Sequence, residues 1–257
     1  MKKVLSFVLS AILCIGVVAS LSFGFTGCGK DENTLVVGYT IYAPMNYYDD
    51  NGEFVGHDTE LAELVCEKLG YEVKFVEIQW DYKVMELESN NIDLIWNGMT
   101  ITDELKESIL ISDPYMINQQ VIVTKSDNAS KYNTKEDLVN ASSVVYEGGS
   151  AAEIVITDLN LPSSVKLVNA TSQASALLEV EAETSEVAVI DITMAKSMTG
   201  EGTDFSNLTY KNVGFPEEQY GIGMRKEDTE LCKKINEVLA EFKEDGTLDE
   251  LYNKYCG

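Results

Sequence analysis

Segments that favour strands alternate with segments that favour helices along most of this chain. TLVVGY at residue 34 favours a strand, and DTELAELVCEKLG has the apolar spacing of an amphipathic helix with Asp58 or Thr59 near its N-cap. YEVKFVEI favours the next strand, residues 82–89 a helix, and IDLIW another strand. Because parallel neighbours need a long crossover connection, the alternation predicts an α/β fold built on mainly parallel sheets.

The same pattern returns in the second half of the chain. SSVVYEGG, SVKLVN and EVAVID favour strands, and the segments that start at Ser150 and span residues 172–183 favour helices. Two further helices are predicted over residues 228–244 and 247–255. A length of 257 residues suits one large domain or two lobes.

The N-terminus has the features of an export signal. Lys2 and Lys3 precede an apolar run that ends in FTGCGKDEN. This segment resembles a bacterial lipoprotein signal over residues 1–27, in which Cys28 is lipidated, although Phe25 stands where that motif usually has Leu. The alternative is an uncleaved anchor, since about 20 apolar residues can span a bilayer. Both interpretations place the remainder outside the cytoplasm, after a polar linker at residues 28–33.

The charge balance is strongly acidic, with 19 basic and 43 acidic residues and a net charge of −24. Phosphate backbones would repel such a surface, so no nucleic-acid partner is expected. A solvated surface accounts for the charge by itself.

Cysteine and histidine usage predicts neither a metal site nor a cofactor. Cys66, Cys232 and Cys256 remain outside the signal, and the sequence does not decide which of them pair in an extracellular setting. The spacing of histidine and cysteine matches no metal motif. His57, the single histidine, stands beside a predicted helix start, where a structural role is expected, although it could instead be a base or a ligand.

Polar segments follow several predicted strands, at the edge where parallel sheets bind ligands. They are YAPM, QWD, NGMT, GGSAAE and DITM. The first three of these segments lie in a stretch that resembles the first lobe of the family 3 extracellular solute-binding proteins of amino-acid ABC transporters. The stretch is VGYTIYAPMNYYDDNGEFVGHDTELAELVCEKLGYEVKFVEIQWDYKVMELESNNIDLIWNGMTIT. The resemblance continues through YGIGMRKEDTEL to the final FKEDGTLDELYNKY.

The resemblance implies a two-lobed clamp of the type II periplasmic-binding-protein kind, in which each lobe is a mainly parallel sheet flanked by helices. Lobe 1 would comprise residues 34–120 and 217–257, and lobe 2 residues 121–216, linked near residues 120–124 and 212–216. Ligand would close the lobes by binding the closed state more tightly. A monomer lipid-anchored at the extracellular face of the bacterial membrane would then deliver its solute to an ABC permease.

The resemblance also assigns ligand contacts one residue at a time. Asp191 corresponds to the acid that pairs with the ligand's ammonium group, although it could instead cap the next helix. Ser150, Ala151 and the residue after them would meet the ligand carboxylate with backbone N–H groups. The remaining contacts are expected from Gly98 and Thr100, and from the aromatic rings of Tyr42 and Trp80, which could instead be core residues.

Two positions depart from the family pattern. Leu105 stands where members that bind α-amino acids usually have an arginine, and the single arginine of the chain, Arg225, lies in a segment predicted to be surface. Lys106 is one residue away, turned by about 100° on a helix. Glu147 stands where the family more often has a neutral pocket residue, although it could also be a solvated acid at a strand end.

Together the departures predict a ligand with net positive charge, such as a basic amino acid or a related amine, or a polar zwitterion. Asn97, Asn118 and Gln120 are candidate amide contacts for it. A ligand-sensing module for a membrane receptor is one alternative. Another is an enzyme that dehydrates cyclic acids, with Glu147 or Asp191 as general acid. Such substrates carry carboxylates that an acidic cleft would hold poorly, so no enzyme activity is expected.

Overall fold

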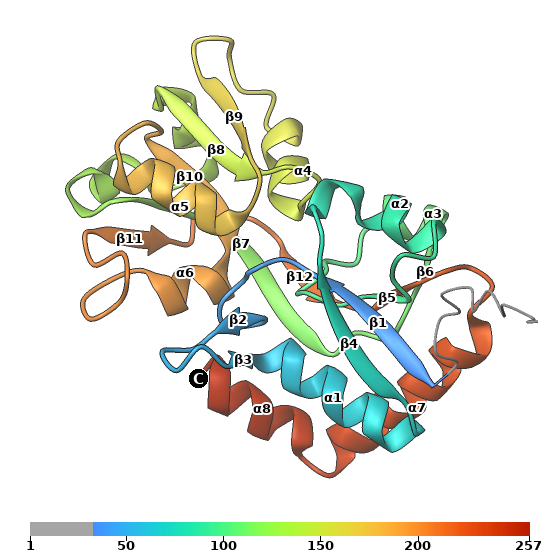
Figure 1. The fold of residues 1–257 in the computed structure, drawn as a ribbon. Coiled ribbons are helices and arrows are strands. Elements are labelled where there is room, and N and C mark those ends of the chain that lie inside the picture. The colour runs from blue at the N-terminus through green and yellow to red at the C-terminus, as the bar shows by residue number, and fades with distance from the viewer. Residues whose placement is uncertain (1–32) are drawn as a thin grey trace, which may run out of the picture. The chain divides into compact units, whose positions relative to one another are not determined.

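The computed structural model describes residues 33–257, which contain two large sheets with flanking helices (Figure 1). The predicted signal peptide, the predicted lipidation site Cys28 and most of the predicted linker lie outside the described residues. Within residues 33–257, no helix has the length and apolar character that crossing a membrane requires.

The first sheet has five strands in the order β4-β1-β5-β13-β6. β1 pairs in parallel with β4 and β5, whereas β13 is antiparallel to β5 and β6. The bounds are β1 (Thr34–Tyr39), β4 (Glu72–Glu77), β5 (Leu94–Ile95), β6 (Leu110–Ile111) and β13 (Gly223–Met224). A separate hairpin joins β2 (Tyr47–Tyr48) to β3 (Phe54–Val55).

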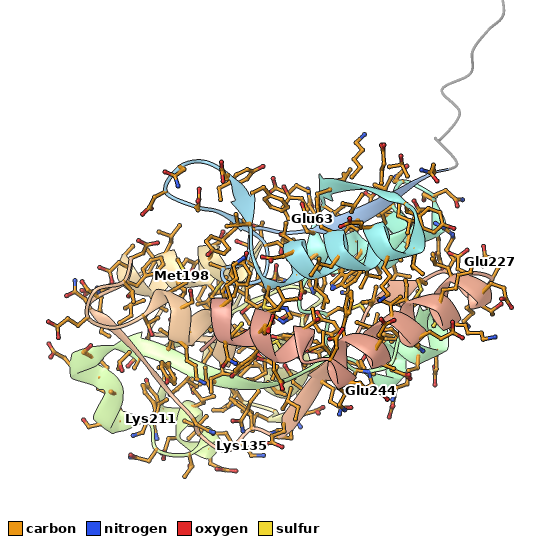
Figure 2. The ribbon with its side chains drawn as sticks, turned by 90° about the horizontal axis from the view of Figure 1, so that it is seen from below. Glu63, Lys135, Met198, Lys211, Glu227 and Glu244 are labelled. Atoms are coloured by element: carbon orange, nitrogen blue, oxygen red, sulfur yellow. The ribbon has the colours of Figure 1, made fainter. Side chains whose placement is uncertain are left out.

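Helices cover both faces of the first sheet. Because successive side chains of β1 point to opposite sides, this strand contributes to two cores. Val37 packs in the core with α1 (His57–Leu69), α7 (Thr229–Glu244) and α8 (Thr247–Tyr255), which lie side by side in Figure 2. The exposed acids Glu63 and Glu244 mark the outer sides of α1 and α7 there. Val36 faces the other core, with Leu87 of α2 (Lys83–Glu88), and α3 (Asp103–Ser108) follows β5.

The second sheet has the order β11-β7-β10-β8-β9, with β12 paired to the first half of β7. β8, β9 and β10 are parallel, whereas β7 is antiparallel to β10, β11 and β12. The bounds are β7 (Met116–Lys125), β8 (Ser143–Glu147), β9 (Lys166–Ala170), β10 (Val187–Asp191), β11 (Leu208–Lys211) and β12 (Glu217–Tyr220). The helices are α4 (Ala151–Asp158), α5 (Gln173–Glu181) and α6 (Ile192–Met198), with short 3-10 helices η1 (Trp80–Tyr82), η2 (Ser126–Lys131) and η3 (Lys135–Asn140).

The strands of the first sheet all come from the ranges expected for lobe 1. β7 runs across the expected boundary between residues 120 and 121, and its two ends pair with β12 and with strands of the second sheet. The lobe boundaries themselves stay a prediction.

Two local expectations are wrong, and a third is refined. The N-cap of α1 is Gly56, and Asp58 and Thr59 lie near it in the first turn, as expected. The φ of 136° at Gly56 and the backbone of Met45, 2.1 Å from where a Cβ would lie, admit only glycine there. The strand expected over IDLIW shrinks to Leu94–Ile95.

Arg225 is not a surface residue. Its guanidinium group forms ion pairs with Asp93 at 2.8 Å and Asp228 at 3.0 Å, and its side chain is 13% exposed. It also donates to the backbone oxygen of Ile92 at 2.8 Å, which ties β13 to the loop before β5. This arginine therefore has a structural role in the first sheet.

Candidate functional site

One small cavity between the two sheets is lined by residues that follow the strand ends. Nine of the residues expected to contact ligand border it, and Gln173 joins them, whereas the candidate amides Asn118 and Gln120 are not among its lining residues. Its volume is about 20 Å³, which is about the room that one water molecule needs. The lining residues are Tyr42, Trp80, Asn97, Gly98, Thr100, Glu147, Ser150, Ala151, Gln173 and Asp191.

Asp191 lies at the end of β10 and is surrounded by side-chain amides. Its carboxylate accepts hydrogen bonds from Asn118 Nδ2 at 2.5 Å, from Gln120 Nε2 at 2.6 Å and from Gln173 Nε2. It makes no side-chain cap of α6, so the expected capping alternative does not hold. Burial raises the pKa of this carboxyl, and the amide hydrogen bonds oppose that rise.

Glu147 ends β8 and is 4% exposed. Its Oε1 has no hydrogen-bond partner among the described residues. Burial, and then the charge of Asp191, raise the pKa of Glu147 to about 8, while Lys83 opposes the rise. The expectation of a solvated acid is therefore wrong, and the group is a buried acceptor at the cavity wall.

A third acid, Glu218 of β12, was not expected from the sequence. Its Oε1 accepts from Thr100 Oγ1 at 3.0 Å, Asn118 Nδ2 at 2.5 Å and Gln120 Nε2 at 2.7 Å. Burial and the neighbouring Asp191 raise its pKa to about 7. The two amides thus bridge two carboxyl groups, and the amide oxygens Asn118 Oδ1 and Gln120 Oε1 are buried without partners among the described residues.

The loop after β5 is held by hydrogen bonds within the first-sheet side. The side-chain amide of Asn97 bonds to Thr40 and Asn46, with Asn97 Nδ2 2.9 Å from Thr40 O and 2.7 Å from Asn46 Oδ1. Gly98 N donates to Asp58 Oδ2 at 2.6 Å. Asp58 is also bonded to His57, so the histidine has a structural role, as expected.

Aromatic residues join the two sides of the cavity. The hydroxyl of Tyr42 lies 2.7 Å from that of Tyr220 and hydrogen-bonds to Thr193 of α6. Trp80 is buried, and the ammonium group of Lys83 lies 4.8 Å from the centroid of its ring. Trp96 is fully buried in the core.

The start of α4 faces the first-sheet side at close range. Ser150 is the N-cap, but its hydroxyl donates to Glu147 O at 2.7 Å and does not cap the helix. A Cβ on Gly149 would lie 2.9 Å from the Cα of Asp81, so only a glycine permits this approach.

A second cavity of about 490 Å³ adjoins the first and shares Trp80, Thr100, Ser150 and Ala151 with it. Leu105 of α3 borders it. Lys106 is exposed and pairs with Asp103 at 3.1 Å, so it does not replace a cation at Leu105. Cys66, Cys232 and Cys256 are free thiols.

Comparisons with known proteins identify the family to which this chain is similar. The model of the bacterial extracellular solute-binding proteins, family 3, matches residues 35–257. The L-cystine-binding protein TcyJ of Escherichia coli is 25% identical over 97% of this chain and 94% of its own length. The probable ABC transporter arginine-binding protein ArtJ of Chlamydia trachomatis is 32% identical over 91% and 92% of the two chains.

A solved structure agrees with the fold. A mutant of ArgBP from T. maritima superposes with a TM-score of 0.79 and 34% identity, covering 87% of this chain and 95% of that one. The expected type II periplasmic-binding-protein fold is confirmed, and the chain belongs to the bacterial extracellular solute-binding proteins, family 3.

Proposed function

We propose that this protein is the lipid-anchored, substrate-binding component of an ABC importer. It captures an amino acid, preferably a basic or polar one, by closing its two lobes, and it delivers that solute to a permease. Cys28 carries the lipid, which holds the protein at the extracellular face of the bacterial membrane. The protein acts as a monomer and catalyses no reaction.

The acidic groups around the small cavity support the preference for a basic or polar amino acid. Asp191 and Glu147 border the cavity, and Glu218 shares two amide donors with Asp191. Buried carboxyl groups are costly unless a cation or hydrogen-bond donors satisfy them. A ligand ammonium or guanidinium group supplies both, and Glu147 Oε1 and the two unpartnered amide oxygens offer it acceptors.

Contacts across the cavity support a closing motion. Tyr42 bonds to Thr193, and Lys83 donates to Gly149 O at 2.7 Å, so both sides touch around a space of about 20 Å³. A free amino acid needs several times that volume, so ligand entry requires the sides to separate. Ligand then favours closure by contacting both sides at once.

The names of the relatives support an amino-acid ligand. One is named for L-cystine and another for arginine, and both are binding proteins. A basic amino acid would meet the acidic groups with its side chain as well as its ammonium group. A zwitterion such as cystine would use the amides of Asn118 and Gln120.

A thermal-shift screen of the common amino acids, L-cystine and simple amines tests the proposal. A ligand at about 100 times its dissociation constant adds about 2.7 kcal/mol of stability. Asp191→Ala should abolish the shift while circular dichroism shows an intact fold, and Glu237→Ala on the exposed face of α7 should leave it unchanged. Stabilisation by acidic amino acids, with basic and polar ones inert, would contradict the proposal.

A lipid anchor has its own test. In cells, Cys28→Ser should prevent incorporation of a labelled fatty acid into the protein. Continued labelling of that variant would refute lipidation at this residue.

A further inference from the structure

Lys83 is a buried cation without a carboxylate partner in the described part of the chain. It begins α2, and its side chain is 6% exposed. Its Nζ donates to Gly149 O at 2.7 Å and to Trp80 O at 3.3 Å, and the ion pairs among residues 33–257 do not include it. A lysine ammonium group has three N–H donors, so one remains after these two carbonyls are counted. The ring of Trp80, with its centroid 4.8 Å from Nζ, also lies beside the ammonium group.

Four acids surround Lys83 without touching it, and three of them, Asp81, Glu104 and Glu153, border the cavity of about 490 Å³. Burial lowers its pKa, and the acids that act on it in the opposite direction, Glu147, Asp81, Glu104 and Glu153, lie beyond ion-pair distance. Burying an ammonium group is costly without a counter-charge at contact distance. An anion that touched Nζ would remove that cost.

Backbone donors converge on the same place. Gly149, which accepts from Lys83, is followed by the first residues of α4, and Ser150 leaves the first N–H groups of that helix without a side-chain cap. Helix N-termini favour anions through these unpaired N–H groups and the helix dipole. Lys83, Ser150 and Ala151 all border the cavity of about 490 Å³.

We propose that Lys83 determines specificity by binding the carboxylate of an amino-acid ligand, together with the N–H groups that begin α4. The inference rests on the proposed function and narrows it, because simple amines then become poor ligands. The carboxylate lies in the larger cavity and the ammonium group points through the shared wall toward Asp191. Since Lys83 and α4 belong to opposite sides, the carboxylate also holds the closed state.

Matched pairs of amino acids and their decarboxylated amines separate this role from general cation binding. The probes are L-arginine with agmatine, L-lysine with cadaverine, L-histidine with histamine and L-cystine with cystamine, titrated by calorimetry. Wild-type protein should bind the amino acid of a pair more tightly than the amine. Lys83→Met should weaken binding of the amino acid about ten- to a hundredfold and change binding of the amine less than about twofold.

Two further variants keep the test decisive. Lys106→Met removes an exposed lysine with the same change in net charge and should leave both affinities unchanged. Lys83→Arg keeps the charge and should keep the preference for the amino acid. If Lys83→Met does not fold, Lys83→Gln replaces it, because its amide still reaches toward Gly149.

Equal weakening of both members of a pair, or no weakening of either, would overturn the role of Lys83 while leaving the proposed function standing. If wild-type protein binds none of the eight probes, the proposed ligand preference and the role of Lys83 fail together.

Discussion

Replacing Glu147 with glutamine should stabilise the ligand-free protein at alkaline pH. The pKa of Glu147 is about 8, against 4.5 for an ordinary glutamate, because burial disfavours its charged form. Between these values the folded protein keeps a proton that the unfolded chain has lost. The free energy of unfolding of the wild type therefore falls as pH rises through this window, by about 1.4 kcal/mol per pH unit from this one group.

Over the interval of about 3.5 pH units, the loss reaches about 5 kcal/mol. This figure is a ceiling, because any separation of the two sides that hydrates Glu147 lowers its pKa. The glutamine variant stays neutral at every pH and avoids the loss. Its advantage over the wild type should thus be near zero at pH 4.5 and grow to between about 1 and 5 kcal/mol at pH 9.

Urea unfolding followed by tryptophan fluorescence measures this difference, with ligand removed beforehand by unfolding and dialysis. Glu237→Gln on the exposed face of α7 is the matched control, and its free energy of unfolding should equal that of the wild type at every pH. A Glu147→Gln variant no more stable than the wild type at pH 9 would refute the burial argument. The same variant should bind L-arginine at least about tenfold more weakly, since it removes the carboxyl group that would ionise beside the ligand cation.

Three other substitutions test the geometry of the site. Gly98→Ala should destabilise the protein by at least about 1 kcal/mol in thermal unfolding, because its φ is 58° and a Cβ would lie 2.6 Å from Tyr42 Cε1; an unchanged melting temperature would contradict this placement. Leu105→Arg should tighten binding of L-arginine relative to agmatine in calorimetry, since Leu105 borders the larger cavity and a guanidinium group binds carboxylates through two hydrogen bonds. Equal effects on both probes would count against a ligand carboxylate in the larger cavity. Tyr42→Phe should favour the open form by about 1 kcal/mol, because it removes the hydrogen bond to Thr193. Small-angle scattering should then give a larger radius of gyration for the ligand-free protein, and an unchanged radius would argue that this contact does not stabilise the closed form.

The periodicity of the sequence predicts most elements because the strands and helices are strongly patterned. It misses features that depend on distant backbone. The N-cap at Gly56 follows from the approach of Met45, and Arg225 is largely covered because Asp93 and Asp228 fold beside it.

In the site, too, some residues could be predicted from the sequence and others depend on distant parts of the chain. Most residues placed by the family resemblance border one cavity, since strand ends meet at one edge of a parallel sheet, although Ala152, the residue after Ala151, does not. Glu218 was missed because its position follows from the register in which it pairs with Asn118 across β7 and β12. Lys83 was missed because WDYKVMEL predicts only a helix with an ordinary lysine, and its burial depends on the loop at Gly149.

Calorimetric titration of the protein with L-arginine, L-glutamine and L-glutamate at pH 7.5 tests the central claim most directly. The acidic groups around Asp191 predict that L-arginine or L-glutamine binds and that L-glutamate does not. Tight binding of L-glutamate, with no heat from the other two, would contradict a cleft selective for basic or polar amino acids.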